Sequence, residues 1–425
     1  MTNLPRRRLL QAGTGAAALA SIGGCASIGT GAGGKVVVVG GGYGGATTAK
    51  YLRKWSDRRI DVTLVERNAS FVSCPISNLV IGGHRKIDDV TMSYDGLRKW
   101  GVNVVRGEVT GIDASQRTVQ LADGTRLPYD RLVLSPGVDF MYEAVPSLRA
   151  AEADGRILHA WKAGPQTVAL RRQLEAMRDG GVYAITVPLM PYRCPPGPYE
   201  RACQVASYLK VAKPRSKVLI LDANPDVVSK GALFKKAWAE LYPGMVEHRG
   251  NNALQDVDPR AMTARLQFDD VKADVLNVVP PMRAGDVARL AGVVNSGNRW
   301  CAVDWLSFES TTVRNVHVLG DATQSATAMP KSGHMANQHA KVAAAAIIEL
   351  LAGRAPSAAP VVTNTCYSFV DAKSVVHVAS VHQYDKAKKS LEPVQGAGGL
   401  SAAASELEAG FAHGWAYNIW NDTLT

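Results

Sequence analysis

The sequence predicts an α/β fold with two Rossmann-like domains, followed by a C-terminal α+β region. Near the start of the chain, KVVVVGGGYGGATTAKYLRKW (residues 35–55) combines a β-branched strand, a glycine turn and a helix whose Ala46, Ala49 and Leu52 share one face. Later, VYAITVP and KVLILDA are short apolar runs on either side of a helical segment, which is the pattern of buried parallel strands. Farther on, TNTCYSFVDAKSVVHVASV has the composition of strands in a third region.

The turn after the first strand has the spacing of a dinucleotide site. Gly40, Gly42 and Gly45 satisfy G-x-G-x-x-G, with a strand before them and a helix after them. The helix N-terminus offers backbone N–H groups and its dipole to a pyrophosphate. Glu66 ends the next apolar run, 21 residues after Gly45, where a carboxylate can accept both hydroxyls of an adenosine ribose. The first domain is therefore predicted to be a dinucleotide-binding domain.

Two later segments, together with this turn, resemble the flavoproteins that contain two dinucleotide-binding domains. These segments are YDRLVLSPG (129–137) and NVHVLGDAT (315–323). That superfamily has a glutathione-reductase-like FAD/NAD(P)-type fold, and the resemblance implies FAD as the ligand of the first domain. It also implies that Asp321 binds the ribityl chain of the flavin. The alternative interpretation of Asp321 is a turn residue at the end of a strand.

These segments divide the chain into five predicted parts. The parts are an export signal (1–33), the first part of the FAD-binding domain (34–150), a second Rossmann-like domain (151–289), the second part of the FAD-binding domain (290–355) and a C-terminal region (356–425).

The second domain lacks the glycine pattern at its strand-to-helix turn, which reads PYRCPPGPYERAC. Pro195, Pro196 and Pro198 stiffen this turn and remove amide donors, and Cys194 precedes them. KVLILDA ends in Asp222, a residue type that can hold a ribose. Because the glycines are missing, NAD(P)H is not the expected ligand of this domain.

The six cysteines do not form a metal-binding pattern. There is no C-x-x-C-H haem motif and no paired C-x-x-C zinc pattern, so no metal site is predicted. His334 and His339 have poor ligand spacing and are interpreted as helix residues. Cys203 and Cys301 are interpreted as structural thiols, with a disulfide between them as the alternative. By its position, Cys74 is either a buried thiol or a neighbour of the flavin.

Several segments resemble the flavoprotein subunit of flavocytochrome c sulfide dehydrogenase, from about residue 34 to the C-terminus. They are CPISNLVIGG, CPPGPYERAC, VVPPMRAG, GDATQSATAMPKSGHMANQHAKVAAAA and TNTCYS, of which CPPGPYE and NTCYS are the specific pieces. The resemblance implies that Cys74 is joined to the flavin by a thioether. It implies that Cys194 and Cys366 form a redox-active disulfide beside the flavin, with Glu200 as an acid nearby.

Three roles stay open at this level. Glu200 is an acid/base for hydrogen sulfide, a group that tunes the pKa of a thiolate, or a first-turn glutamate favoured by the helix dipole. Lys331, in MPKSG, is a cation near the flavin or a surface lysine. Hydrosulfide attack on a disulfide gives a persulfide and a thiolate, and either Cys194 or Cys366 can take the added sulfur.

The resemblance implies a periplasmic FAD-dependent sulfide dehydrogenase that passes electrons to a cytochrome c. Because the chain has no haem motif, the haem is expected on a separate cytochrome c subunit in a heterodimer. One alternative is a sulfide:quinone reductase, which would need a quinone pocket and membrane-binding helices. Another is an accessory flavoprotein of sulfur oxidation without dehydrogenase turnover of its own.

The N-terminus, PRRRLLQAGTGAAALASIGGCAS, has the layout of an export signal and resembles a twin-arginine signal. It predicts a periplasmic location, with either simple cleavage near 30–34 or a lipid anchor at Cys25. No later apolar run is long enough for a membrane span. The net charge is +11, but no basic run is interleaved with aromatic residues, so nucleic acid is not an expected partner.

Overall fold

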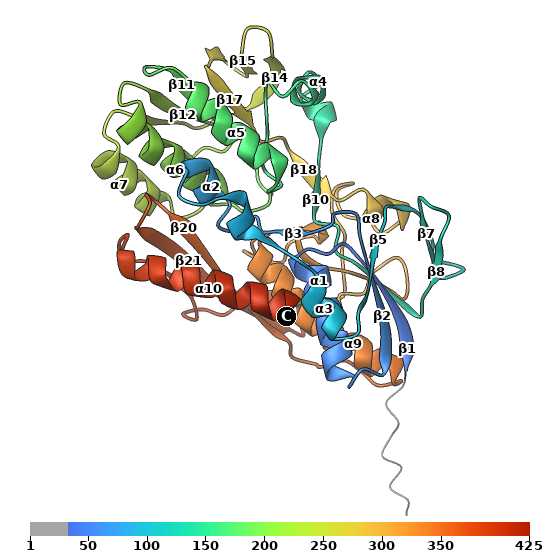
Figure 1. The fold of residues 1–425 in the computed structure, drawn as a ribbon. Coiled ribbons are helices and arrows are strands. Elements are labelled where there is room, and N and C mark those ends of the chain that lie inside the picture. The colour runs from blue at the N-terminus through green and yellow to red at the C-terminus, as the bar shows by residue number, and fades with distance from the viewer. Residues whose placement is uncertain (1–32) are drawn as a thin grey trace, which may run out of the picture. The chain divides into compact units, whose positions relative to one another are not determined.

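The computed structural model describes residues 33–425 (Figure 1). The arginines and Cys25 of the predicted export signal lie outside the described residues. One cluster of buried apolar side chains runs from Val36 in the first strand to Leu424 in the last helix. Every helix within residues 33–425 is too short or too polar to span a bilayer.

The first domain is built on a five-stranded parallel sheet with strand order β19-β9-β1-β2-β5. Its strands are β1 (Gly34–Val39), β2 (Ile60–Glu66), β5 (Asn103–Arg106), β9 (Arg131–Leu134) and β19 (Val316–Val318). The valines of β1 are buried because a parallel sheet is covered on both faces. Helices α1 (Tyr43–Trp55) and α9 (Gly333–Leu351) pack against each other. The strand and helix expected at the glycine turn are therefore present.

The second domain has a four-stranded parallel sheet with strand order β13-β12-β11-β17. Its strands are β11 (Val182–Val187), β12 (Lys217–Asp222), β13 (Val246–Arg249) and β17 (Val275–Val278). Its longer helices are α5 (Pro165–Ala176), α6 (Gly197–Ala212) and α7 (Gly231–Leu241). The loop that carries Cys194 joins β11 to α6 at the carboxyl end of the sheet, which is where ligands bind in such folds.

The C-terminal region is an antiparallel sheet with a long helix beside it (Figure 1). It consists of β20 (Val361–Phe369), β21 (Val375–Asp385), β22 (Ser390–Pro393), β23 (Gly399–Leu400) and α10 (Glu406–Leu424). Strand β20 contacts both α6 and α9, so this region touches both parallel-sheet domains. The predicted fold class, two Rossmann-like domains and a C-terminal α+β region, is confirmed.

The end of α10 contacts the first helix of the chain. Lys50 of α1 donates hydrogen bonds to the carbonyl oxygens of Asn421 (3.0 Å) and Asp422 (2.9 Å). The Tyr51 hydroxyl donates to the Asp422 carboxylate, which also accepts a hydrogen bond from Asn337 of α9 (2.8 Å). The last residues of the chain therefore fasten the helix that follows the glycine turn.

The remaining elements are short and connect these units. The strands are β3 (Phe71–Val72), β4 (Thr91–Met92), β6 (Val109–Asp113), β7 (Thr118–Leu121), β8 (Arg126–Pro128), β10 (Val138–Phe140), β14 (Leu254–Asp258), β15 (Thr263–Leu266), β16 (Asp270–Lys272) and β18 (Met282–Ala284). The helices are α2 (Asn78–Gly82), α3 (Asp95–Lys99), α4 (Leu148–Ala153) and α8 (Val287–Leu290), with 3-10 turns η1 (Ile87–Val90), η2 (Tyr142–Ala144) and η3 (Gly320–Ala322).

Candidate active site

The three glycines of the first turn meet three different steric requirements. Gly40 has a φ of +98°, and a Cβ there would lie 2.4 Å from the carbonyl oxygen of Ser135. A Cβ on Gly45 would lie 1.9 Å from the carbonyl oxygen of Gly40, so α1 can approach the turn only without a side chain. Gly42 would meet no protein atom within 4 Å, and it lines an open cavity. Space at Gly42 is therefore kept for a ligand rather than for protein packing.

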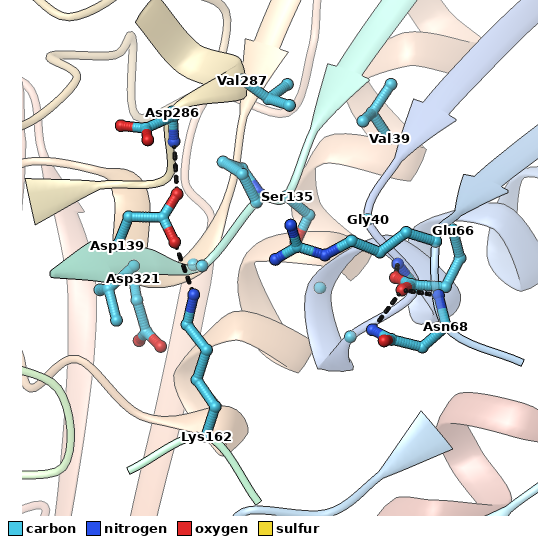
Figure 2. Close-up of a pocket in the computed structure, with 18 of the residues that line it drawn as sticks. Val39, Gly40, Glu66, Asn68, Ser135, Asp139, Lys162, Asp286, Val287 and Asp321 are labelled. Atoms are coloured by element: carbon cyan, nitrogen blue, oxygen red, sulfur yellow. Dashed lines mark hydrogen bonds and ion pairs between the residues drawn. The ribbon is translucent and has the colours of Figure 1, made fainter. Parts of the chain in front are cut away.

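That cavity has a volume of about 900 Å³ and lies at the carboxyl ends of the first parallel sheet (Figure 2). Val39, Glu66, Ser135 and Asp321, which end or follow four of its strands, all line it. A cavity of this size at the carboxyl edge of an α/β sheet is the expected position of a nucleotide. Of the predicted cofactor residues, Gly40, Gly42, Glu66, Cys74 and Asp321 line the cavity.

Glu66 is fixed at the end of β2 by backbone and side-chain donors (Figure 2). One carboxylate oxygen accepts a hydrogen bond from the Gly41 amide (2.7 Å). The other accepts from the backbone amide (2.8 Å) and the side-chain amide (2.7 Å) of Asn68. This arrangement orients the carboxylate beside the glycine turn, as a ribose-binding residue requires.

Asp321 is a buried carboxylate with an unused acceptor. It lies in η3, it is 9% exposed, and its Oδ1 atom has no hydrogen-bond partner among the described residues. Burial raises the pKa of Asp321, and the nearby Arg193 and Lys331 only partly offset this effect. A buried acceptor without a donor costs about 1–3 kcal/mol. A ligand hydroxyl would supply that donor, so the cavity fits a flavin dinucleotide with its ribityl chain at Asp321.

Lys331 is buried behind Asp321 and does not line the cavity. Its ammonium donates to the carbonyl oxygens of Asp321 (3.0 Å) and Thr323 (2.5 Å) and lies 3.8 Å from the centre of the Trp300 ring. Burial lowers the pKa of Lys331 to about 8. It is therefore not a surface lysine, and its carbonyl oxygen accepts a hydrogen bond from the Cys194 amide (2.8 Å).

Cys74 is a partly exposed thiol in the wall of the same cavity. Its sulfur accepts a hydrogen bond from the amide of Ala163 (3.4 Å). Arg193, the residue before Cys194, also lines the cavity and donates to the carbonyl oxygen of Trp161. The predicted flavin neighbour and the cysteine loop of the second domain therefore meet at one side of the cavity.

Cys194 is held in a left-handed backbone conformation, with a φ of +59°. Its carbonyl oxygen accepts a hydrogen bond from Gly197 (2.8 Å) at the start of α6. A Cβ on Gly197 would lie 3.0 Å from the Cys194 sulfur and 2.8 Å from the Trp161 ring. The glycine in CPPGPYE is thus needed to make room for the sulfur. Burial raises the pKa of the Cys194 thiol, and the nearby Cys366 adds to this effect.

Cys366 comes from the C-terminal region, near the middle of β20. Its sulfur accepts a hydrogen bond from the Asn364 side-chain amide (3.3 Å). Both Cys194 and Cys366 are free thiols in the structure, so the disulfide implied by the family resemblance stays a prediction. Cys203 and Cys301 are also free and are fully buried, so the alternative of a disulfide between them is not found.

Glu200 connects the two segments that carry these thiols. It is buried in the first turn of α6, where it accepts hydrogen bonds from the Asn78 side chain (2.9 Å) and the Phe369 backbone amide (3.0 Å). Burial raises the pKa of Glu200, although both of these donors oppose the increase. A helix-dipole role alone would not explain a buried position between α2, α6 and β20.

Lys230 is a residue that sequence patterns do not single out, and the structure places it against Cys366. Lys230 is 5% exposed, and its ammonium donates to the carbonyl oxygen of Cys366 (2.9 Å) and the hydroxyl of Ser368 (2.7 Å). Burial lowers the pKa of Lys230 to about 8, while Cys366 and Glu200 act in the opposite direction. No short motif marks this lysine, because its partners lie more than 130 positions away.

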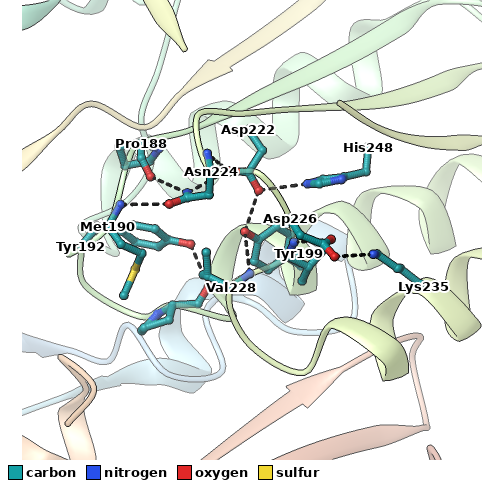
Figure 3. A network of polar contacts seen from close by, with 12 residues as sticks. Pro188, Met190, Tyr192, Tyr199, Asp222, Asn224, Asp226, Val228, Lys235 and His248 are labelled. Atoms are coloured by element: carbon teal, nitrogen blue, oxygen red, sulfur yellow. Dashed lines mark hydrogen bonds and ion pairs between the residues drawn. The ribbon is translucent and has the colours of Figure 1, made fainter. Parts of the chain in front are cut away.

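Asp222, considered above as a ribose ligand, is buried, and both of its carboxylate oxygens bind protein side chains or backbone (Figure 3). One carboxylate oxygen accepts from the Tyr199 hydroxyl (2.7 Å) and lies 3.0 Å from His248 Nε2. The other accepts from the backbone amide (2.9 Å) and side-chain amide (2.8 Å) of Asn224. The place of a second dinucleotide therefore holds a closed polar network, which braces the loop before α6.

His334 and His339 both lie in α9, as the sequence predicts for helix residues. The described residues contain no cluster of histidine, cysteine and carboxylate side chains suited to a metal.

Comparison with known proteins assigns the family. Residues 167–280 match the family described as sulfide dehydrogenase [flavocytochrome c] flavoprotein chain, central. Residues 358–424 match flavocytochrome c sulphide dehydrogenase, flavin-binding, and residues 34–167 match pyridine nucleotide-disulphide oxidoreductase. The sulfide dehydrogenase flavoprotein chain of Chlorobaculum thiosulfatiphilum is 67% identical over 46 residues, which are 94% of that sequence and 11% of this chain. This chain belongs to the flavocytochrome c sulfide dehydrogenase flavoprotein family.

As a sulfide dehydrogenase flavoprotein, the chain is a flavin-dependent, sulfide-oxidising oxidoreductase. Related proteins include a mitochondrial sulfide:quinone oxidoreductase of Dictyostelium discoideum, 25% identical over 69% of this chain and 66% of that protein, slightly under two thirds of its length. The sulfide-quinone reductase of Aquifex aeolicus is 24% identical over 78% of this chain and 80% of that protein. A solved sulfide:quinone oxidoreductase structure from Aquifex aeolicus shares the fold, with a TM-score of 0.74 and 19% identity over 92% of this chain and 91% of that one.

Proposed function

We propose that this flavoprotein oxidises sulfide through a Cys194–Cys366 disulfide and passes the electrons, by way of FAD, to a separate cytochrome c subunit. The observation that carries the proposal is that the Cys194 loop, whose Arg193 lines the flavin-sized cavity, is joined through Glu200 to the strand that carries Cys366. Cys194 precedes α6 in the second domain, whereas Cys366 lies in β20 of the C-terminal region. Glu200 hydrogen-bonds between these two elements.

The residues that hold FAD in this proposal belong to the cavity of the first domain. The glycine turn and the N-terminus of α1 would hold the pyrophosphate, Glu66 would bind the adenosine ribose, and Asp321 would accept a hydrogen bond from the ribityl chain. Cys74 is proposed to hold the flavin covalently through a thioether. A bound flavin accepts an electron pair and releases single electrons, which suits a haem acceptor.

The chain's own chemistry begins with the disulfide. Hydrosulfide attacks one sulfur, forms a persulfide there and releases the other sulfur as a thiolate. Glu200 is buried and has a raised pKa, so it exchanges protons nearer neutral pH than an exposed glutamate does. Its position beside β20 suits a proton acceptor for hydrogen sulfide. Asp222 and its partners close the second dinucleotide position, which supports sulfide rather than NAD(P)H as the source of electrons.

The cytochrome partner is proposed from the family name and from the sequence, which has no haem motif. The Chlorobaculum thiosulfatiphilum relative is named as the flavoprotein chain of a flavocytochrome. A periplasmic location, reached through a twin-arginine-type signal with cleavage or with a lipid anchor at Cys25, accompanies this proposal. The described residues include no helix that could span a membrane. The sulfide:quinone relatives are named for a different electron acceptor, a quinone.

The test is an anaerobic titration of the purified flavin-loaded protein with sulfide, followed by addition of cytochrome c or a soluble quinone. Sulfide should bleach the flavin, NADH should leave it oxidised, and cytochrome c should restore its colour faster than quinone does. Cys194→Ser and Cys366→Ser should each abolish bleaching, while Cys203→Ser, which changes a buried thiol outside the site, should not. Bleaching by NADH alone would refute the proposal, and faster turnover with quinone would refute the cytochrome acceptor.

A further inference from the structure

The two thiols of the proposed disulfide have unequal surroundings. The Cys366 sulfur accepts a hydrogen bond from Asn364, and the Lys230 ammonium binds the carbonyl oxygen of the same cysteine. Among the hydrogen bonds of residues 33–425, none is donated to the Cys194 sulfur, which lies beside Gly197. Arg193 and Lys230 also act to lower the pKa of Cys194, but only the Cys366 sulfur has a hydrogen-bond donor, and this donor favours a negative charge on Cys366.

Lys230 is an unusual buried cation. No carboxylate lies within ion-pair distance of its ammonium in the described part of the chain, and its hydrogen bonds go to Cys366, Ser368 and Val376, all in the C-terminal sheet. A buried charge without an ionic partner costs several kcal/mol. An uncharged hydrogen-bond donor could fill a purely structural role at a lower cost in folding free energy. The Lys230 ammonium is therefore placed to stabilise a thiolate that forms only during the reaction.

The local backbone delivers this cation to β20. Lys230 is the N-cap of α7 and has a φ of +57°, in the left-handed region. The loop before it is held by a hydrogen bond from the Val228 amide to the Tyr199 hydroxyl (3.3 Å), which in turn donates to Asp222 (Figure 3). Tyr192, in the same loop as Cys194, donates to the carbonyl oxygen of Pro195 (3.0 Å). The polar network thus positions both the lysine and the cysteine loop.

We propose that Lys230 is a positioning residue that makes Cys366 the leaving thiolate, so that sulfide adds to Cys194. The inference rests on the proposed function and specifies its first step. The hydrosulfide sulfur forms a bond to the Cys194 sulfur, and the bond between Cys194 and Cys366 breaks. The electron pair of the broken bond goes to the Cys366 sulfur, and the hydrosulfide proton stays on the terminal sulfur of the Cys194 persulfide. Atoms and charge balance without a further reactant.

Thiol–disulfide exchange favours this direction, because a thiol with a lower pKa leaves faster. Burial raises the pKa of Cys366, but Lys230, Asn364 and Ser332 oppose the increase. The other charged groups that face Lys230 are Glu200 on α6 and Glu408 on α10, together with Cys194, and each of them favours the protonated lysine. Lys230 is therefore a cation at neutral pH and loses this role as the pH rises above about 8.

The first experiment measures the thiols alone and needs no sulfide. The flavin-loaded protein is reduced with a dithiol, and the two cysteines are alkylated over a range of pH and separated by peptide mass spectrometry. Cys366 should react at lower pH than Cys194. In Lys230→Met, which keeps the aliphatic stem and removes the charge, the pH of half-reaction of Cys366 should rise by about one unit or more. Lys230→Arg should restore the original value.

The second experiment locates the added sulfur. The oxidised protein receives one equivalent of sulfide without oxygen and is then trapped with the alkylating reagent. The extra sulfur should be on Cys194 and the alkyl group alone on Cys366. In Lys230→Met the opening of the disulfide should slow by about 10-fold, with sulfur distributed over both cysteines. The matched control is Lys213→Met at the far end of α6, because Lys213 is also buried and bonded to carbonyl oxygens but contacts neither cysteine.

The possible results separate the two proposals. Extra sulfur on Cys366 in the unaltered protein overturns this inference and leaves sulfide oxidation intact. An unchanged alkylation profile in Lys230→Met, or an equal change in Lys213→Met, also overturns it. If sulfide fails to react at all, the proposed function fails, while the alkylation profile still decides whether Lys230 favours a Cys366 thiolate. If Lys230→Met does not fold, the trapped position in the unaltered protein and in Lys230→Arg still decides the direction of attack.

Discussion

The Glu200 carboxylate accepts a hydrogen bond from the backbone amide of Phe369, with 3.0 Å between Oε1 and the nitrogen. This bond joins the helix that follows Cys194 to the strand that carries Cys366. Leaving the buried Phe369 amide without a partner would cost about 1–3 kcal/mol. The relative position of the two thiols therefore depends on Glu200, whichever proton-transfer role it also has.

The raised pKa of Glu200 predicts how its contribution to stability changes with pH. Because burial raises the pKa in the folded state, this contribution is fully present below the pKa of an unfolded glutamate and is lost as the pH rises through the folded value. The difference in melting temperature between the unaltered protein and Glu200→Gln should therefore be larger at pH 5 than at pH 8. Thermal unfolding at several pH values measures it, and a difference that grows with pH would contradict the pKa shift.

Substitution by alanine should have different effects at Gly42 and at Gly45, lowering flavin content at the first and protein stability at the second. Gly45→Ala places a methyl group 1.9 Å from the Gly40 carbonyl oxygen, so it should destabilise the protein with or without flavin. Gly42→Ala meets no protein atom, so the flavin-free protein should keep its melting temperature within a few degrees while its flavin content falls sharply. Melting curves of the flavin-free forms and absorbance spectra of the purified proteins decide this. Full flavin content in Gly42→Ala would contradict the proposed binding of the pyrophosphate at this turn.

The buried charge of Asp321 should lower the stability of the flavin-free protein, and a variant without that charge should be more stable. Asp321→Asn keeps the shape but not the buried charge, so at pH 8 the flavin-free variant should be more stable by about 1–3 kcal/mol. The same variant should bind flavin more weakly, because the amide is a poorer acceptor for a hydroxyl. Denaturant unfolding of both forms measures the two effects. A variant that is less stable without flavin would show that Asp321 has a structural partner.

We expect the flavin to be covalently bound through Cys74. In the unaltered protein, yellow colour should remain with the precipitate after treatment with acid, whereas Cys74→Ala should release it into solution. Cys301→Ala is a matched control, because Cys301 is a free, fully buried thiol that does not line the cavity. Release of flavin from the unaltered protein would exclude the thioether and leave Cys74 as a non-bonded neighbour.

Much of the first domain follows from local sequence. The strand, the glycine turn and α1 are contiguous, and each of Gly40, Gly42 and Gly45 has a steric reason that its spacing reveals. Glu66 was also predictable, because the residue that ends the second parallel strand lies at the edge of the sheet that binds a nucleotide, whereas the role of Asp321 was implied by the family resemblance. The family match then assigns flavin-dependent sulfide oxidation to a fold that alone would allow many activities.

The thiol environment did not follow from local sequence. Cys366 and its partner Lys230 are 136 residues apart, and no spacing rule relates a helix N-cap in one domain to a strand in another. Asp222 ends a strand as a ribose ligand would, yet Tyr199, Asn224 and His248 occupy its oxygens. Its role is decided by side chains that approach from two other segments, α6 and β13, together with the neighbouring Asn224. Such residues carry no individual signal until the tertiary structure is known.

The hydrogen bonds from Lys50 to the carbonyl oxygens of Asn421 and Asp422 join residues that lie 371 and 372 positions apart. Closing so long a loop costs chain entropy before these contacts form, so the helix that follows the glycine turn gains this support late in folding. The glycine turn is therefore a local motif whose supporting helix depends on contacts of very high contact order.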